Sequence, residues 1–251
     1  LQIVESRDLA AAIQAAATAR WPNEACGLVL RQGKKSVAIE VKNSAAKPQS
    51  NFLISTEDYA ALAAQGEVIG VWHTHAEAEA RPSMADLAGC EISELPWFLM
   101  SVFKRDDGFE LSELVRFDPN GFEAPYEGRP YAFGVLDCWE LVRDYYRREF
   151  GIQLRAYARQ EDFWKKGDDL LGANWEEEGF TLIKRGLAAE IGDLFLFQTD
   201  ATGVPNHIGI YVGGNRLLHH CKGRLSCSEP YAGHWQKHTV RHIRHNSKVN
   251  A

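Results

Sequence analysis

The chain has 251 residues, of which 45% are hydrophobic and 25% charged, and its net charge is −6 at pH 7. This is the composition of a globular protein, and the length allows one large domain or two of ordinary size. The acidic balance argues against nucleic acid as the main partner, because phosphate binding needs a basic face. No apolar run of about 20 residues exists, so no membrane-spanning segment is expected. Five scattered cysteines favour free thiols in a reducing compartment.

The first part of the chain alternates helices and strands. Helices are predicted at 8–20, 57–65 and from Ser83 to about residue 92, with Thr56 and Ser83 as N-caps of the last two. Strands are predicted at 26–31, 37–41, 68–72, 98–103 and 109–117. This order predicts an α/β unit in which a sheet is flanked by helices.

A linker follows, with three prolines and two glycines between Pro119 and Pro130. It predicts two domains, residues 1–121 and 122–251. In the second, a helix is predicted at 138–150, one or two helices within 160–179, and strands at 193–198, 207–212 and 216–220, which together indicate an α+β domain. The basic stretch from His234 to Lys248 is interpreted as a solvated edge strand and tail.

Two histidines stand directly after the apolar strand 68–72, at His73 and His75. Residues two apart on a strand share a face, so both imidazoles can point at one ion. Asp86 lies three residues after Ser83, on the first turn of the expected helix. Two histidines and a carboxylate suit catalytic Zn²⁺, with water in the fourth position. Glu24, ahead of the strand 26–31, is the candidate acceptor for that water's proton.

The pattern H-x-H, seven residues, then S-x-x-D, with an upstream glutamate, resembles the JAMM (MPN-plus) metallopeptidase signature. The resemblance covers roughly residues 1–117. It implies Zn²⁺ held by His73, His75 and Asp86, Glu24 as general base, and Ser83 stabilising the oxyanion. Ala76 stands where the family often has proline, which removes no ligand.

Cys138 opens the helix predicted at 138–150. A helix N-terminus favours a thiolate, and a thiolate is the better nucleophile. His207 opens a strand, and a hairpin through 213–215 can bring His219 beside it. This arrangement predicts a nucleophile, a base and an orienting third group. His220, Cys221 and Cys227 are interpreted as ordinary strand-end and loop residues rather than a second metal site, and Cys26 and Cys90 as core residues.

The second half resembles the NlpC-type papain-like cysteine peptidases, which cleave peptidoglycan stem peptides. The matching parts are Y-x-x-G at 131–134, D-C at 137–138, G-D-L-F at 192–195, and H-x-G-I-Y at 207–211 with His219 beyond it. The resemblance implies a Cys138, His207 and His219 triad, with Tyr131 in the oxyanion region. Trp139 and Glu140 replace the family's usual small residues after D-C, which leaves substrate preference open.

A JAMM domain directly ahead of an NlpC-type domain is similar to the tail assembly proteins of lambda-like phages. That resemblance implies a virion tail-tip protein assembled in the host cytoplasm, with other tail-tip proteins as partners and peptidoglycan as substrate on infection. Three hypotheses remain open. The chain is a bifunctional peptidase used in tail assembly or local cell-wall degradation, a structural tail-tip component with vestigial sites, or a bacterial modifier isopeptidase with an accessory domain.

Overall fold

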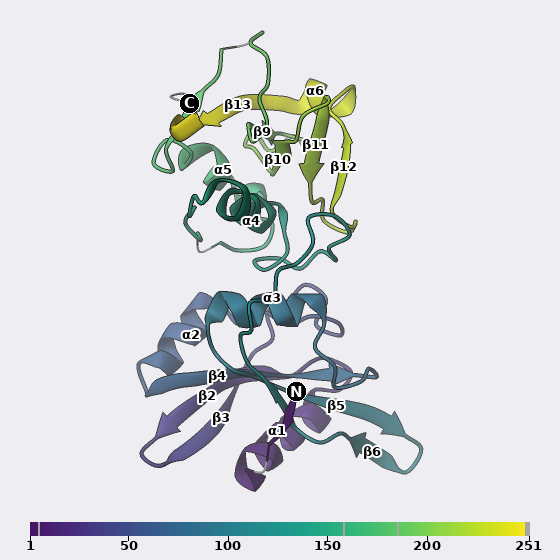
Figure 1. Cartoon of the computed structure of the whole chain (residues 1–251). Helices are drawn as coiled ribbons and strands as arrows, with labels where there is room; N and C mark the ends of the chain where they lie inside the picture. Colours follow the sequence, from purple (N-terminus) through teal and green to yellow (C-terminus); the bar gives the residue numbers. More distant parts are fainter. Residues whose placement is uncertain (5, 158, 185, 249–251) are drawn as a thin grey trace. The chain divides into compact units, whose positions relative to one another are not determined.

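The computed structural model describes residues 1–4, 6–157, 159–184 and 186–248. The chain forms two compact units, Leu1–Glu123 and Ala124–Ala251, each described by itself (Figure 1). The backbone amides of Asn120 and Phe122 donate to Glu91 of the first unit. The amides of Gly128 and Arg129 instead donate to Ser226 of the second. A search of the described residues finds no helix with the length and apolar character needed to cross a membrane.

The first unit is built on a seven-stranded sheet, as far as the described residues show. Its elements are β1 (Gln2–Ile3), α1 (Arg7–Arg20), β2 (Cys26–Gln32), β3 (Lys35–Val41), α2 (Thr56–Ala63), β4 (Glu67–Ala76), α3 (Met84–Ser93), β5 (Trp97–Arg105), β6 (Gly108–Leu111) and β7 (Val115–Phe117). The strand order is β1-β7-β5-β4-β2-β3, with β6 also paired to β5. β4 and β5 run parallel, so the chain must cross over between them, and α3 makes that crossover.

Helices cover both faces of this sheet, with α1 on one face and α2 and α3 on the other (Figure 1). In β4, Val71 packs in the cluster with α2 and α3, whereas Trp72 packs in the cluster with α1. Since side chains alternate along a strand, His73 and His75 share the face of Val71 and point toward α3. The apolar alternation of β4 therefore decides which helix meets the two histidines.

Two local expectations for the first unit were wrong. The N-cap of α2 is Ser55 rather than Thr56, because the Ser55 hydroxyl accepts from the Asp58 amide at 3.0 Å. The strand expected at 109–117 is two strands, β6 and β7. The strand is interrupted at Ser112, whose hydroxyl accepts a hydrogen bond from the backbone amide of Ser101 at 2.9 Å.

The second unit is built on a six-stranded sheet, again counted over the described residues. Its elements are α4 (Cys138–Phe150), η1 (Phe163–Lys166), α5 (Leu170–Ala173), β8 (Phe180–Leu182), β9 (Leu194–Phe197), β10 (His207–Tyr211), β11 (Arg216–His219), β12 (Cys227–Pro230), α6 (His234–His238), β13 (Thr239–His245) and η2 (Asn246–Lys248). The order is β12-β11-β10-β9-β13-β8, with antiparallel pairs throughout.

Alternation along β9 builds a core on each face of this sheet. Leu194 and Leu196 pack in the cluster that contains the apolar side of α4. Phe195 and Phe197 pack on the opposite face with Trp235 of α6. The stretch 234–248 was expected to be a solvated edge strand and tail, and this was wrong. It contains α6 and then β13, which lies between β9 and β8 and buries Ile243.

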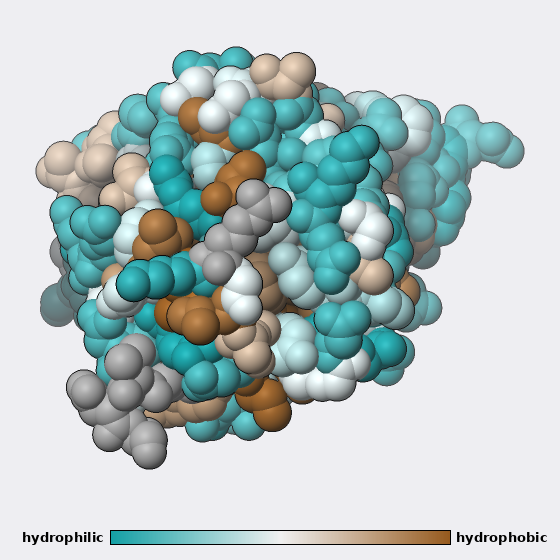
Figure 2. Space-filling view, turned by 90° about the horizontal axis from the view of Figure 1, so that it is seen from above, coloured by the Kyte–Doolittle hydropathy of each residue, from teal (hydrophilic) through white to brown (hydrophobic). Residues whose placement is uncertain are grey.

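The surface seen in Figure 2 is largely hydrophilic, with hydrophobic residues interspersed. The large hydrophobic side chains that the second unit exposes include Leu182, Leu187, Ile191, Leu225 and Val240. Exposed residues of this kind are ordinary on globular proteins. The chemistry-bearing residues lie elsewhere, at the ends of β4, α3, α4, β10 and β11.

Candidate metal centre and candidate thiol site

Three side chains of the first unit converge at the point where β4 ends and α3 begins. The Nε2 atoms of His73 and His75 are 3.3 Å apart. The His73 Nε2 lies 3.3 Å from Asp86 Oδ1, and the His75 Nε2 lies 3.3 Å from Asp86 Oδ2. Ligands about 2.0–2.1 Å from a tetrahedral Zn²⁺ are separated from one another by about 3.3 Å. The donor set and its spacing therefore fit a zinc ion with three protein ligands.

Neighbouring groups fix the orientation of these side chains. The Asp86 carboxylate accepts from the Ser83 amide at 2.7 Å, while the Asp86 amide donates to the Ser83 hydroxyl at 3.2 Å. This capping box at the start of α3 locks the carboxylate against the strand. His75 donates from Nδ1 to the Glu79 carbonyl at 2.9 Å, which leaves the Nε2 lone pair free.

His73 is held by packing rather than by a second hydrogen bond. Its ring stacks on Phe52, with the centroids 4.5 Å apart, and meets Trp97 edge-on. The His73 side chain is fully buried, and its Nδ1 has no hydrogen-bond partner among the described residues. A buried imidazole with one unpaired nitrogen is costly unless the other nitrogen is strongly bound, as it would be by a metal.

Glu24 is buried just ahead of β2, with 6% of its surface exposed. Burial raises the pKa of its carboxyl to about 8; the attraction of His75 opposes that shift, and repulsion from Asp86 adds to it. For Asp86 burial also acts upward, yet His73, His75 and the Ser83 amide hold its pKa well below the usual range. The two carboxyls thus differ in protonation near neutral pH, with Asp86 charged and Glu24 able to exchange a proton.

In the second unit, Cys138 is the first residue of α4, and Asp137 caps this helix. One Asp137 oxygen accepts from the amides of Trp139 and Glu140, each at 3.0 Å. The other accepts from the Gly134 amide at 2.8 Å and from Arg159 at 2.7 Å. Arg159 is therefore the cation that keeps the buried cap charged.

The thiol of Cys138 is protonated at neutral pH. Burial raises its pKa to about 12, and the Asp137 carboxylate adds to this, against the opposing effects of Arg159 and the Ile208 backbone. The helix N-terminus was expected to favour the thiolate. Burial and the adjacent carboxylate outweigh that effect, so the thiol must lose its proton to a base during the reaction.

His207 and His219 lie on the adjacent antiparallel strands β10 and β11. His207 Nε2 and His219 Nδ1 are 2.9 Å apart, and His219 Nε2 lies 2.8 Å from Glu229 Oε1. Burial holds the pKa of His207 well below its usual value, so its ring is neutral at pH 7. Gly209 pairs with His219, and a Cβ there would lie 2.7 Å from Leu217 Cδ1 and 3.1 Å from His219 Cβ. Glycine at this position therefore leaves room for the side chains of β11 beside β10.

Cys138, His207 and Tyr131 line one cavity of about 540 Å³. Tyr131 meets His220 edge-on, with ring centroids 5.3 Å apart, and burial raises the pKa of its hydroxyl. The second histidine, His219, joins the site through its hydrogen bond to His207. The structure thus brings Cys138, His207 and Tyr131 to one cleft, with His219 hydrogen-bonded to His207.

Sequence reasoning missed Arg159 and Glu229. Arg159 lies in a stretch without strand or helix, and Glu229 lies on β12, a strand that was not expected. Glu229 lies opposite Leu217 in the register of β11 and β12. That register can be assigned only once β12 is known, so the sequence alone carried no signal for Glu229.

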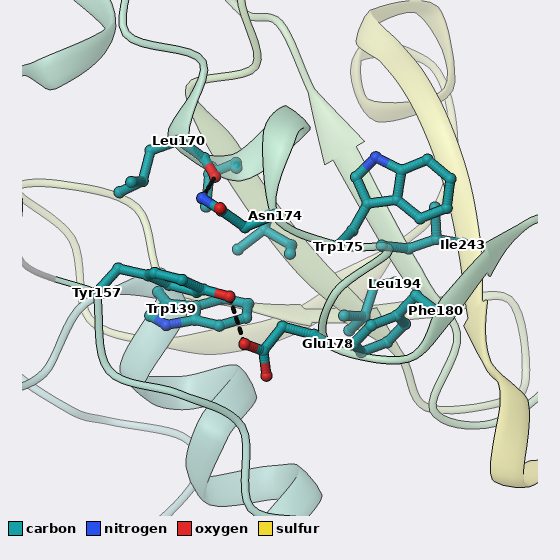
Figure 3. Close-up of a pocket in the computed structure, with 11 residues that line it drawn as sticks. Trp139, Tyr157, Leu170, Asn174, Trp175, Glu178, Phe180, Leu194 and Ile243 are labelled. Carbon is teal, nitrogen blue, oxygen red and sulfur yellow. Dashed lines mark hydrogen bonds between the residues drawn. The ribbon is translucent and has the colours of Figure 1, made fainter.

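Trp139 lines both the cleft and a small apolar pocket, the latter shown in Figure 3. Its indole donates to the Arg155 carbonyl at 3.1 Å, and its ring lies beside Tyr157. The Tyr157 hydroxyl donates to Glu178 (Figure 3). The pocket measures about 20 Å³, room for roughly one water molecule. Trp139 therefore serves as a wall of the cleft and as part of the core.

Comparisons with known proteins find a different family in each of the two units. Residues 6–112 match the family of prokaryotic homologs of the JAB domain, and residues 128–244 match the NlpC/P60 family. Fold and sites together define a protein in which a JAB-type domain precedes an NlpC/P60 domain, which confirms both family resemblances and the two-domain fold class.

Two phage proteins match most of the length of this chain. Tail tip assembly protein K of Escherichia phage N15 is 36% identical over 93% of this chain and 93% of its own length. Tail tip assembly protein K of Escherichia phage lambda is 33% identical over 77% of this chain and 90% of its own length. The chain belongs to the tail tip assembly protein K family. The Escherichia coli (strain K12) protein called murein DD-endopeptidase MepS/murein LD-carboxypeptidase is 28% identical over 45% of this chain and 54% of its own length.

Proposed function

We propose that this protein is a tail-tip peptidase of a phage, with a cysteine endopeptidase site for peptidoglycan stem peptides in residues 122–251 and a zinc-dependent (iso)peptidase site in residues 1–121. It acts in tail assembly or in local cell-wall degradation on infection, with other tail-tip proteins as partners. It is assembled in the host cytoplasm and works at the virion tail tip. The observation that carries the proposal is the chain of hydrogen bonds from His207 through His219 to Glu229 beside the Cys138 cleft.

Glu229 sets the tautomers of both histidines. A carboxylate only accepts, so His219 Nε2 carries the proton in the 2.8 Å contact to Glu229. The neutral His219 then has a lone pair at Nδ1, which accepts the proton carried by His207 Nε2. His207 Nδ1 is left as a free base. In the proposed reaction it takes the Cys138 proton as sulfur attacks the scissile carbonyl and later gives it to the leaving amine.

Charge on the attacked carbonyl oxygen needs hydrogen-bond donors. The Asp137 cap uses the amides of Trp139 and Glu140, so in this mechanism the amide of Cys138 itself serves the oxyanion. Tyr131, at the wall of the same cleft, is the second donor. Burial keeps its hydroxyl protonated, as a donor must be.

In the first unit, His73, His75 and Asp86 are the proposed holders of Zn²⁺. Bound there, the ion would supply a Lewis acid and a water molecule with a pKa of about 7. Glu24 holds or releases a proton at its carboxyl near neutral pH, as a general base must. The Ser83 hydroxyl accepts from Asp86, so its own hydrogen remains available to an oxyanion.

Digestion of purified sacculi tests the thiol assignment. The wild-type chain is expected to release stem-peptide fragments, detected by mass spectrometry, and Cys138→Ala to release none. Cys90→Ala removes a buried thiol of the first unit, outside the proposed thiol site, and is expected to retain this activity. Chelation with EDTA is expected to leave this activity intact. Equal release by wild type and Cys138→Ala would contradict the assignment.

A structural role is the second candidate, favoured by membership in the tail tip assembly family. Phage complementation separates the two. If turnover is needed, His73→Ala or Cys138→Ala virions lose infectivity although tails assemble. Full infectivity from both variants supports a structural role with vestigial sites.

A further inference from the structure

Cys221 lies beside the two histidines of the thiol site, although from the sequence it was interpreted as an ordinary strand-end or loop residue. Its Sγ is 3.5 Å from His219 Nδ1 and 3.8 Å from His207 Nε2. Those two nitrogens are 2.9 Å apart. One sulfur and two imidazole nitrogens, from β10, β11 and the residue two beyond His219, therefore form a compact triangle of metal-binding atoms.

The dimensions of this triangle are close to those of a zinc site. With Zn–S about 2.3 Å and Zn–N about 2.0–2.1 Å, tetrahedral ligands lie about 3.6 Å apart for each N–S pair and about 3.3 Å for the N–N pair. The two sulfur distances already match within a few tenths of an ångström. Only the His207–His219 pair has to open, by about 0.4 Å from its 2.9 Å hydrogen bond.

The neighbouring groups favour Nδ1 of His219 as the atom that binds the metal. A metal-binding histidine commonly donates its other N–H to a carboxylate, which orients the ring. His219 Nε2 makes that contact with Glu229 at 2.8 Å, and Glu229 is itself held by the Trp235 indole at 2.9 Å. An alternative group of His219, Cys227 and Glu229 would use Nε2 and lose this support. Its sulfur is also farther away, at 3.9 Å.

We propose that His207, His219 and Cys221 form a second metal site, specific for a thiophilic divalent ion such as Zn²⁺, whose occupation switches off the thiol chemistry. On binding, the Cys221 thiol releases one proton to solvent, and the His207 proton moves from Nε2 to Nδ1. The moved proton occupies the nitrogen that serves as base for Cys138. Metal binding and peptide cleavage are therefore mutually exclusive. Inhibition rests on the proposed function, whereas metal binding does not.

Cobalt substitution tests binding without any activity. A thiolate ligand gives Co²⁺ an intense near-ultraviolet charge-transfer band, which the first centre cannot give because His73, His75 and Asp86 offer no sulfur. The reduced full-length chain is titrated with Co²⁺ and then with Zn²⁺. Wild type, Cys138→Ser and Cys227→Ala are expected to show the band and to lose it to Zn²⁺. Cys221→Ala is expected to lack the band. A band of full intensity in Cys221→Ala, or none in wild type, overturns the site.

Zinc inhibition of sacculus digestion tests the consequence. Cys221→Ala leaves the His207–His219–Glu229 contacts in place, so its activity without added metal is expected to match wild type. Its half-inhibiting Zn²⁺ concentration is expected to rise at least tenfold. Equal zinc sensitivity of both proteins overturns the switch. If no protein digests sacculi, the proposed function fails, and the cobalt band still decides the metal site.

Discussion

At the scale of single residues, the position of Glu229 explains why the thiol site needs an acid beside His219. Glu229 Oε1 accepts from both His219 Nε2 and the Trp235 indole, at 2.8 and 2.9 Å. Without Glu229, the His219 proton can lie on Nδ1 and be donated to His207 Nε2. The proton of a neutral His207 would then lie on Nδ1, the nitrogen proposed to act as base. The His207 tautomer that can accept the Cys138 proton would then be a minor one.

Truncating that acid gives a prediction. Glu229→Ala is expected to lower kcat for stem-peptide release by about 10- to 100-fold, part of the roughly 10²- to 10⁴-fold that a positioned base contributes. KM is expected to change less than about twofold, because Glu229 acts through His219 and the loss falls on the chemical step. Glu229→Gln keeps an acceptor and is expected to lose less. A change confined to KM, or equal losses in both variants, would contradict the orienting role.

The residues that spacing alone could predict are those of one strand and the turn after it. His73, His75, Ser83 and Asp86 are linked by the geometry of β4 and the first turn of α3, which local sequence encodes. Glu229 and Arg159 enter their site across strands or from a loop. Their positions depend on packing over long sequence separations, which no local pattern carries.

At the scale of elements, the start of α3 combines a helix cap with a metal ligand, and the two roles can be separated. Asp86→Asn is expected to reduce bound zinc at the first centre at least tenfold, measured by metal analysis after dialysis. Ser83→Ala removes the hydroxyl that caps α3 and is expected to cost about 1 kcal/mol of unfolding free energy while all three ligands remain. If Ser83→Ala lost zinc as fully as Asp86→Asn, the ligand assignment would be wrong.

The strand β13 is tied to the sheet by a buried acid that precedes β9. Asp193 accepts from His242 at 2.6 Å and from Arg244 at 2.7 and 2.8 Å. Burial acts to raise its pKa, but Arg244 and His242 hold it at about 2. A depressed carboxyl pKa stabilises the fold above the ordinary value of about 4, and that contribution disappears as pH falls toward 2.

Asp193→Asn is therefore expected to lower the unfolding free energy of the second unit by about 3 kcal/mol at pH 7, because it leaves Arg244 without its buried partner. The variant is also expected to lose the part of the pH dependence between pH 4 and 2 that comes from this group. Calorimetry at both pH values measures this. Glu190→Gln is the matched control, since Glu190 also pairs with Arg244 but is mostly exposed, and about 0–1 kcal/mol is expected. Equal losses of unfolding free energy in the two variants would contradict the role of Asp193 in holding β13 to the sheet.

At the scale of the whole molecule, the sequence predicted two domains because its linker is dense in proline and glycine. The finer course of the chain was less predictable. β13 was expected at an edge because the stretch from His234 to Lys248 is basic and rich in histidine, yet Ile243 and the pairs to Asp193 place it inside the sheet. A strand rich in basic residues is compatible with either position, and only the partner strands decide between them.

Each unit has its own apolar core on both faces of its own sheet, so each is expected to fold alone. Fragments 1–123 and 124–251, cut where the chain divides, are expected to unfold cooperatively, with melting temperatures within a few degrees of the two transitions of the full chain. The second fragment is expected to digest sacculi as the full chain does, and the first to bind zinc through His73, His75 and Asp86. Calorimetry and metal analysis of the two fragments measure these outcomes. A fragment that unfolds without a cooperative transition would show that its core depends on the other unit. The zinc site and the thiol site would then depend on each other for their stability.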